Sequence, residues 1–396
     1  MAEENLSPDA ALARGASAED EGERELLIMH VGNVFLDAAV PHLRQDREEH
    51  RMTEKRLAFS RLMRVVKEEG VSLLLFSGNL VDGTYAAQDT LRYLCDLFAA
   101  NPACQFVICT GEVDKYEGNS IYSYESWPDN VHIFTSPVPA TVHLPSLGVC
   151  VYGWGYAADR AVVPAFEGAV FDKTLYNVLC GTDNTEKDGD TSPLWRGMSA
   201  LGANYLALTK RNASFAGFSS MPTGLAAYSG SFESEGFGEC SPGGVNLLRV
   251  EKTEKGYRSY PVRLPLGTLR YAVEHMDISY LSEEEIEREI FARIAKEGYG
   301  EETVLRVVYT GCVPPEAVPV CRMDGGRFGV YALQICDESL PTRGASYLER
   351  EDSLAGELYR ALLPKMQAED PEERRLAVRA FRMGYAALLG RDLAES

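Results

Sequence analysis

Several features that would assign this chain to a familiar class are missing from its sequence. It has no run of about 18 apolar residues, the length that a membrane-spanning helix needs. Its nine cysteines include no C-x-x-C pair, so neither a disulfide framework nor a zinc site is expected. The first residues are acidic and polar, whereas a signal peptide begins basic and then turns apolar. These absences predict a cytoplasmic protein with free thiols and no membrane segment.

Basic residues are also scarce. The chain has 39 lysines and arginines against 59 aspartates and glutamates, and its formal net charge is −20 at pH 7. Nucleic acids are bound largely by Lys and Arg side chains, which neutralise phosphates and release counterions. Because the overall field of this chain is negative, it repels such a ligand. We therefore expect weak DNA binding, or none, by this chain alone.

Widely used catalytic patterns are absent as well. No G-x-S-x-G sequence, the mark of a nucleophile elbow, occurs. The glycine pairs at 243–244 and 325–326 lack the strand–loop–helix setting of a phosphate-binding loop. The sequence therefore offers no ready template for hydrolysis or nucleotide binding.

The length and composition that are present indicate a soluble protein of more than one domain. The 396 residues exceed one ordinary domain, and 45% of them are hydrophobic. Residues 1–24 form an acidic leader that we expect to be disordered, residues 25–265 a first domain, and residues 270–396 a second. No internal repeat is apparent.

The first domain alternates continuous apolar strands with amphipathic helices. Strands are predicted at 26–31, 71–76 and 105–109, and helices at 48–69 and 86–99. Strands that are apolar throughout are typical of a sheet covered on both faces. A second set of short strands is predicted at 131–134, 140–144, 149–153, 176–180, 205–208 and 245–250, and residues 215–244 are expected to be mostly loop.

The second domain is predicted to contain helices at 282–296, 353–363 and 371–389 and strands at 304–310 and 328–335. On the last helix, an apolar stripe recurs near helical spacing. Such a stripe is more often part of an internal core than a surface for a partner, so we expect core. Its residues are Leu376, Ala380, Met383 and Ala387.

Five short segments, each at the end of a predicted strand, carry a resemblance to a known family. Their order and setting resemble those of the SbcD-like DNA repair exonucleases of the calcineurin-like metallophosphoesterase superfamily, and stretches at 127–134, 151–156 and 228–237 extend the resemblance. It covers roughly residues 25–390 and implies a four-layer α/β/β/α sandwich with a C-terminal α+β accessory domain. The five segments are residues 30–35, 77–82, 111–114, 179–181 and 208–212.

The resemblance also implies a site with two divalent ions, which hold a phosphate and activate a water. The residues of this chain at the corresponding positions are poor ligands. The bridging aspartate corresponds to Asn79, and the proton donor to Val113. The other positions of the first ion fall on Asn33, Phe35 and Asn212, and those of the second on Glu112, Cys180 and Lys210. Hard ions such as manganese favour carboxylate and imidazole instead.

Three interpretations of this altered site remain. The first is a pseudoenzyme without metal and without cofactor. The second is a repurposed site with different chemistry. The third is a weak metal site built from Glu112, Cys180 and Asp114, in which manganese or another divalent ion would still act. We favour the first, because every ligand position is changed while neighbouring glycines are kept.

One contact is predicted specifically. Glu112 and Lys210 belong to two loops that would both contact the second ion, so the Lys210 ammonium could pair with Glu112 within about 4 Å and replace the ion. The alternative is that both side chains extend unpaired into a water-filled cleft.

Two functions follow from these interpretations. The first is a non-catalytic binding or regulatory subunit, whose partner by resemblance is an SMC-like ATPase or an active paralogue, with homodimerisation also implied. The second is an active metal-dependent phosphoesterase or nuclease with a non-standard site.

Overall fold

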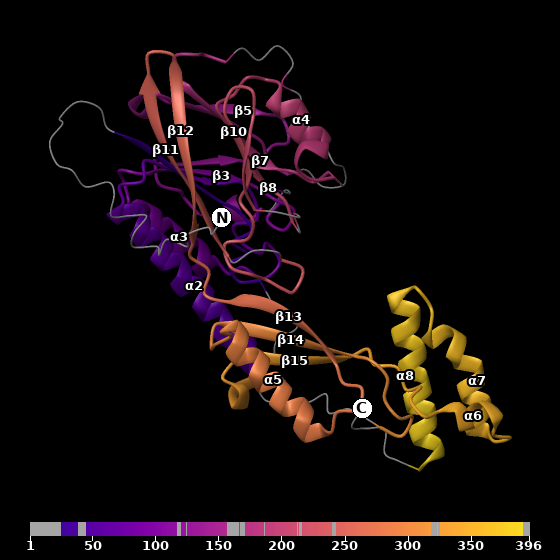
Figure 1. Cartoon of the computed structure of the whole chain (residues 1–396). Helices are drawn as coiled ribbons and strands as arrows, with labels where there is room; N and C mark the ends of the chain where they lie inside the picture. Colours follow the sequence, from indigo (N-terminus) through magenta and orange to yellow (C-terminus); the bar gives the residue numbers. More distant parts are fainter. Residues whose placement is uncertain are drawn as a thin grey trace. The chain divides into compact units, whose positions relative to one another are not determined.

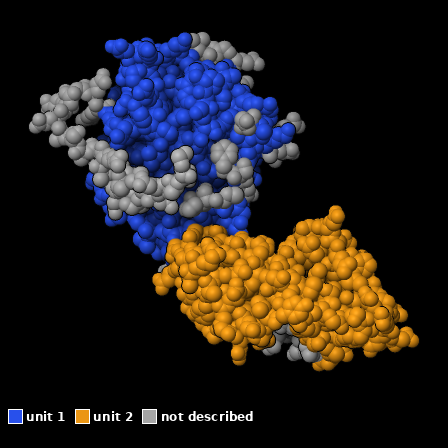
Figure 2. Space-filling view, in the orientation of Figure 1, with its two compact units in different colours: residues 1–269 blue, residues 270–396 orange. Residues whose placement is uncertain are grey.

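The computed structural model describes residues 25–38, 45–116, 120–123, 125–156, 166, 171–185, 187–211, 213, 216–239, 243–317, 323 and 325–390, the side chains of 45–50 and 190 excepted. The chain divides into two compact units, residues 1–269 and 270–396 (Figure 2). Both units combine helices with sheets that contain parallel strands, which confirms the predicted mixed α/β class. The predicted leader and Asn212 lie outside the described residues.

The first sheet positions three of the five segments. Its strand order is β12-β11-β1-β2-β3-β4, in which β1 to β4 are parallel to one another, β11 is antiparallel to β1, and β12 is antiparallel to β11. Because the carboxyl ends of parallel strands meet at one edge, the loops that follow β1, β2 and β3 gather there. The strands are β1 (Leu26–Val31), β2 (Leu73–Phe76), β3 (Gln105–Cys109), β4 (Val131–Phe134), β11 (Gly244–Thr253) and β12 (Gly256–Pro265).

Two helices, α2 (Gln45–Glu68) and α3 (Gln88–Ala99), cover one face of this sheet (Figure 1). Phe59 of α2 and Phe98 of α3 belong to the same buried cluster as Phe76 and Phe106 of the strands. The apolar residues whose helical spacing predicted α2 and α3 are thus buried in one shared core.

The second sheet packs on the other face of the first. Its strand order is β5-β6-β7-β8-β10-β9. A second buried cluster contains Ile28 and Val107 from the first sheet together with Val151 and Val178 from the second. The helix α4 (Pro193–Ser199) packs through Trp195 in a further cluster with residues of β7, β8 and β10. The strands are β5 (Ala140–Leu144), β6 (Val149–Gly153), β7 (Tyr176–Thr182), β8 (Tyr205–Thr209), β9 (Gly217–Ser220) and β10 (Leu225–Tyr228).

Two of these strands correct an expectation. β9 and β10 lie inside residues 215–244, which we expected to be mostly loop. β10 pairs with β8 in parallel and with β9 antiparallel, so tertiary pairing gives strand structure to a stretch rich in glycine and serine.

The second unit contains a parallel sheet of β13 (Arg270–Asp277), β14 (Thr303–Thr310) and β15 (Ala332–Asp337), with α5 (Glu283–Glu297) packed on it. A capping box between Ser282 and Glu285 begins α5. A separate cluster joins α6 (Ser346–Arg350), α7 (Leu354–Met366) and α8 (Pro371–Leu388).

The apolar stripe of α8 is not core, so our expectation for it was wrong. The buried face of α8 consists instead of Ala377, Val378, Phe381 and Tyr385. Leu376 is 71% exposed and Met383 40%, and Ala380 and Ala387 are exposed as well. Within the described residues, no helix combines the length and the apolar character that a membrane crossing requires.

Candidate functional site

Three non-glycine residues of the candidate site have left-handed backbone angles. The angle φ is 49° at Asn33, 50° at Phe35 and 59° at Asn79. Asparagine tolerates this region, whereas an aromatic residue there is strained, at a cost of roughly 1–3 kcal/mol. The N–H groups of Val34 and Phe35 both donate to the Asn79 carbonyl, at 2.9 and 3.0 Å, and hold the turn. The strained residue, Phe35, thus lies at a position where the resemblance places a metal ligand.

A chain of amide hydrogen bonds joins four loops of this site. The Val113 backbone N–H donates to Asn79 Oδ1 at 3.2 Å, and Asn79 Nδ2 donates to Asn33 Oδ1 at 2.8 Å. Asn33 Nδ2 then donates to the Lys210 backbone oxygen at 3.1 Å. Both asparagines are 1% exposed. The amide chain therefore connects the loops that follow β1, β2, β3 and β8.

The two ends of the amide chain fix its direction. It begins at an N–H group, which only donates, and ends at a carbonyl, which only accepts. Each asparagine must therefore present its oxygen to one neighbour and its nitrogen to the other. An ionised aspartate has no donor, so it could occupy neither position without breaking one bond of the amide chain.

This arrangement does not fit a divalent ion. The two asparagines are neutral and bonded to each other, and the Phe35 and Val113 side chains have no donor atom. In the part of the chain that the structure describes, no three His, Cys, Asp or Glu side chains come together as a group that could hold a metal ion.

Asp114 is occupied by the loops around it. Its carboxylate accepts from the N–H groups of Gly111, Asn79 and Leu80, at 2.5 to 3.2 Å, and from Tyr122 Oη at 2.6 Å. Burial raises the pKa of Asp114, and these hydrogen bonds lower it. The described contacts make this weak metal candidate a structural organiser of the loops after β2 and β3.

Cys180 lies in the core rather than at the cleft. It is fully buried in the apolar cluster between the two sheets, where Cys109 Sγ donates to its carbonyl at 3.2 Å. Burial also raises the pKa of the Cys180 thiol well above its usual value. The β7 residue that reaches the site is Thr182, whose Oγ1 donates to the Ser77 carbonyl at 3.1 Å.

The Lys210 side chain has an enclosed environment, and the predicted pair with Glu112 is wrong. The Lys210 ammonium lies 2.9 Å from Asp188 Oδ1 and donates to the backbone oxygens of Lys187, at 2.8 Å, and Thr185. All three of its protons are thereby used. The ammonium thus binds three groups of the loop after β7 and does not contact Glu112 in the loop after β3.

Glu112 pairs instead with Arg211, the residue that follows Lys210. Glu112 Oε2 lies 3.9 Å from Arg211 Nη1, and both side chains are about half exposed. Such an exposed pair contributes little to stability. The guanidinium carbon of Arg211 also lies 5.9 Å from the centre of the Phe35 ring, within the range of a cation–π contact.

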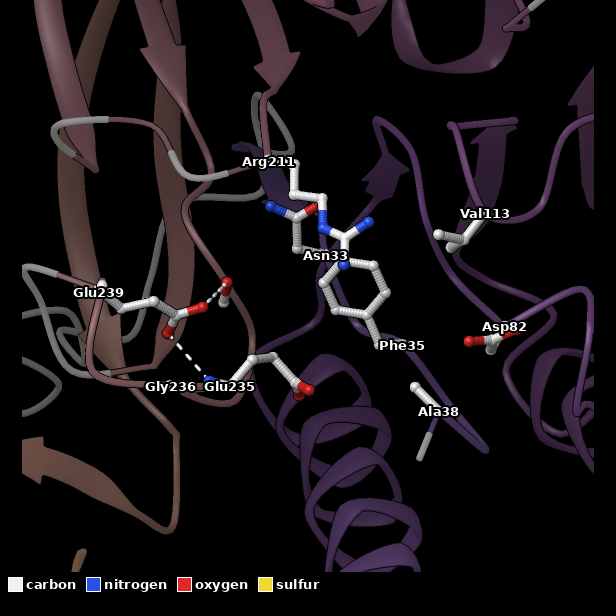
Figure 3. Close-up of a pocket in the computed structure, with 11 residues that line it drawn as sticks. Asn33, Phe35, Ala38, Asp82, Val113, Arg211, Glu235, Gly236 and Glu239 are labelled. Carbon is white, nitrogen blue, oxygen red and sulfur yellow. Dashed lines mark hydrogen bonds between the residues drawn. The ribbon is translucent and has the colours of Figure 1, made fainter. Parts of the chain in front are cut away.

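A cleft of about 240 Å³ opens beside these residues (Figure 3). Phe35 and Arg211 lie between two carboxylates, Asp82 on one side and Glu239 on the other. The cleft is lined by Asn33, Phe35, Ala38, Asp82, Val113, Arg211, Ser231, Glu235, Gly236, Gly238 and Glu239.

The carboxylates of the cleft differ in their partners. Glu235 pairs with the buried Lys55 at 2.7 Å. Glu239 accepts from Ser231 Oγ at 2.6 Å and from the Glu235 N–H at 3.1 Å, and burial raises the pKa of Glu239 to about 7. Asp82 accepts from the Thr84 N–H at 2.9 Å. Among the described residues, neither Glu239 nor Asp82 forms an ion pair with a lysine or arginine.

A buried polar network joins β1 to the loop after β2 and to β8. His30 is fully buried, and its ring nitrogens contact Tyr205 Oη and Ser77 Oγ, each at 2.7 Å. Burial, together with the positive charge of Arg263, lowers the pKa of His30 to about 3. Ser77 also contacts Thr209 Oγ1. The imidazole is therefore neutral and serves as a bridge between β1 and the second sheet.

Comparisons with known proteins add little. No protein-family model matches the chain, and no curated protein matches it. It is similar to solved structures of Vps29 from Cryptosporidium parvum (11% identity, TM-score 0.31, covering 61% of this chain and 100% of that one) and of wild-type Vps29 with zinc from Entamoeba histolytica (11%, 0.28, 60% and 99%). At these TM-scores the likeness supports no conclusion about fold or function.

Sequence reasoning missed several residues that shape the site. Thr182, Asp188, Arg211 and Glu239 all contact it, yet none of them is a position that the resemblance assigns to a metal ligand. Asp188 and Glu239 stand in loops whose paths no local pattern predicts. Arg211 is directly adjacent to Lys210, so a search for charges beside each ligand position would have found it.

Proposed function

We propose that this chain is a catalytically degenerate, metal-independent member of the calcineurin-like metallophosphoesterase superfamily, related to SbcD-like exonucleases. Its two sheets and flanking helices would then be the four-layer α/β/β/α sandwich, and residues 270–396 the accessory domain. The chain would act as a non-catalytic binding or regulatory subunit rather than as a nuclease.

The amide chain from Val113 through Asn79 and Asn33 to Lys210 is the observation that carries this proposal. It links the loops that two cations would otherwise hold together, and it uses groups that need no cation. The enclosed ammonium of Lys210 contributes a fixed positive charge on the side of β8. Together these contacts support loops that keep their form without metal.

The partner class comes from the resemblance alone: an SMC-like ATPase, an active paralogue or a second copy of this chain. The exposed stripe of α8 offers a surface with the apolar character that such a subunit needs.

The proposal is tested by metal content and activity measured on one preparation. Protein produced in manganese-supplemented medium is analysed for bound metals and assayed on single-stranded DNA and on a chromogenic phosphodiester, with added manganese. We expect well under one equivalent of metal and no turnover above a matched blank.

About one equivalent of retained metal together with turnover would overturn the proposal. A useful control is a variant in which Asn79 and Asn33 are both changed to aspartate. If that variant alone gains manganese, the wild-type residues are what excludes the ion.

A further inference from the structure

We propose that the cleft between Asp82 and Glu239 binds an organic cation, an alkylammonium or guanidinium group, and excludes phosphate. This inference rests on the proposed function, because it takes the cleft to be free of metal. It reverses the ligand charge that the resemblance implies for this place.

The first argument is the balance of charge in the cleft. Glu235 is compensated by Lys55 at 2.7 Å, and Arg211 by Glu112 at 3.9 Å. Asp82 and Glu239 remain, and among the described residues neither has a basic ion-pair partner. Lys55 and Arg263 act on Glu239 electrostatically without a direct ion pair. An anion entering here would meet these two carboxylates, whereas a cation would give each of them a direct partner.

The second argument is the aromatic surface. The Phe35 ring is held in a strained left-handed turn, and a guanidinium, that of Arg211, already lies over it at 5.9 Å. The ring face therefore already serves as a platform for a cation. Because the Arg211 side chain is 56% exposed, it can move outward and leave the ring to a competing cation.

The third argument separates an organic cation from a metal ion. A hard metal ion needs several oxygen or nitrogen ligands at one point, and the described residues bring no three together here. Ala38, Val113 and Phe35 offer apolar walls instead, which suit the alkyl part of an amine. The volume of about 240 Å³ is below the roughly 300–1,000 Å³ of drug-sized pockets, so it fits a small amine or one side chain.

The charged groups that face Glu239 also determine a pH effect. They are Glu235, Lys55 and Arg263, whose guanidinium donates to the Ser229 carbonyl at 2.7 Å and to Asn246 Oδ1 at 3.0 Å. Because burial raises the pKa of Glu239 to about 7, part of its population is neutral at neutral pH. Cation binding should therefore strengthen as the pH rises above 7.

The test is calorimetric titration of the full-length protein in the presence of EDTA. The ligands are agmatine and spermidine, then the amides of N-acetyl-arginine and N-acetyl-lysine, and finally inorganic phosphate. We expect one cation to bind per chain and phosphate not to bind over the same concentration range. Binding of the amino-acid amides would indicate a side chain of a partner protein as the source, and binding of the free amines alone a polyamine.

Substitutions give the sharpest result. Asp82→Asn and Glu239→Gln should each weaken agmatine binding about five- to tenfold, whereas Arg211→Ala should tighten it about fivefold, because it removes a competing cation from Phe35. The matched control is Glu254→Gln, an exposed carboxylate in the turn between β11 and β12, which should change nothing. Circular dichroism verifies that each variant is folded.

Two results would overturn the inference: no binding of any cation by metal-free protein, or phosphate binding more tightly than agmatine. Weaker agmatine binding in Arg211→Ala would also contradict it. Retained metal, by contrast, would overturn the proposed function, so the two failures are distinguishable.

Discussion

Asn33 and Asn79 differ from aspartates by a single group each, yet that group decides what the site can hold. An amide both donates and accepts, whereas a carboxylate only accepts. With 1% exposure, neither asparagine can turn to water for a missing partner. A buried polar group left without its partner costs about 1–3 kcal/mol. Removing one hydrogen bond of the amide chain therefore leaves a buried polar group without a partner.

The substitution Asn79→Asp tests this directly. The new carboxylate can still accept from Val113 but cannot donate to Asn33, so we expect a loss of about 2–4 kcal/mol in the free energy of unfolding at pH 7. The loss should shrink at about pH 4, where a protonated carboxyl group can donate again. Urea unfolding at the two pH values measures both effects. A loss below about 0.5 kcal/mol at pH 7 would contradict the role of the amide chain.

Glu239 makes stability depend on pH in the opposite sense to an ordinary ion-paired carboxylate. Its pKa is about 7 in the folded chain against 4.5 for the free group, so the folded state binds the proton more tightly. Stability from this residue is complete below pH 4.5 and is lost as the pH rises toward and through 7.

Glu239→Gln should remove this dependence. Relative to wild type, the variant should gain about 1–3 kcal/mol between pH 5 and pH 8, as thermal or urea unfolding would record. Glu254→Gln serves as the exposed control. Parallel pH profiles for wild type and Glu239→Gln would rule out a perturbed carboxyl at this position.

At the scale of elements, the loops after β2 and β3 are packed so closely that only glycine fits between them. A Cβ atom at Gly111 would lie 2.2 Å from Asn79 Oδ1 and 2.6 Å from its backbone nitrogen. The same Asn79 atoms carry the amide chain and the bond to Asp114. A side chain at position 111 would therefore push the two loops apart and break the hydrogen bonds of Asn79.

Gly111→Ala should destabilise the protein by more than about 2 kcal/mol, because the neighbouring atoms are backbone or fully bonded. Gly197→Ala is the matched control: it lies in α4, and nothing stands within 4 Å of an added Cβ. The control should be neutral or slightly stabilising, since alanine favours helix. Chemical denaturation compares the two. Equal effects would argue against close loop packing.

The sequence predicted elements better than contacts. Continuous apolar strands and periodic helices gave β1 to β3, α2 and α3 because those patterns arise from the burial that they cause. β9 and β10 were not predicted, because β10 forms by pairing with the distant strand β8 and β9 forms by pairing with β10. The stripe of Leu376 and Met383 was misread because α8 carries a second, truly buried face.

The sequence predicted which loops form the candidate site but not which side chains contact one another there. The order of the five segments indicated which loops carry Asn33, Asn79 and Lys210, and the structure joins these three residues. The partner of Lys210 could not be foreseen, because Asp188 reaches it through a loop path that is not encoded locally. Whether the wild-type site excludes metal stays a prediction.

For the whole molecule, the charge of −20 governs encounters with polyanions. The cleft adds to that field, because Asp82 and Glu239 lack basic ion-pair partners among the described residues. We expect no binding of a fluorescent single-stranded oligonucleotide tighter than about 10 µM at roughly physiological salt. Anisotropy measures this, with a basic DNA-binding protein as the positive control. Submicromolar affinity at that salt would contradict the expectation.

The central claim is that the remnant site stands without metal. Its most direct test is titration of the EDTA-treated, dialysed protein with Mn²⁺ under electron paramagnetic resonance, which detects the free hexaaqua ion. The account predicts that the free signal grows as in buffer alone, with no site tighter than about 1 mM. Loss of one or two equivalents of signal with micromolar affinity would contradict it.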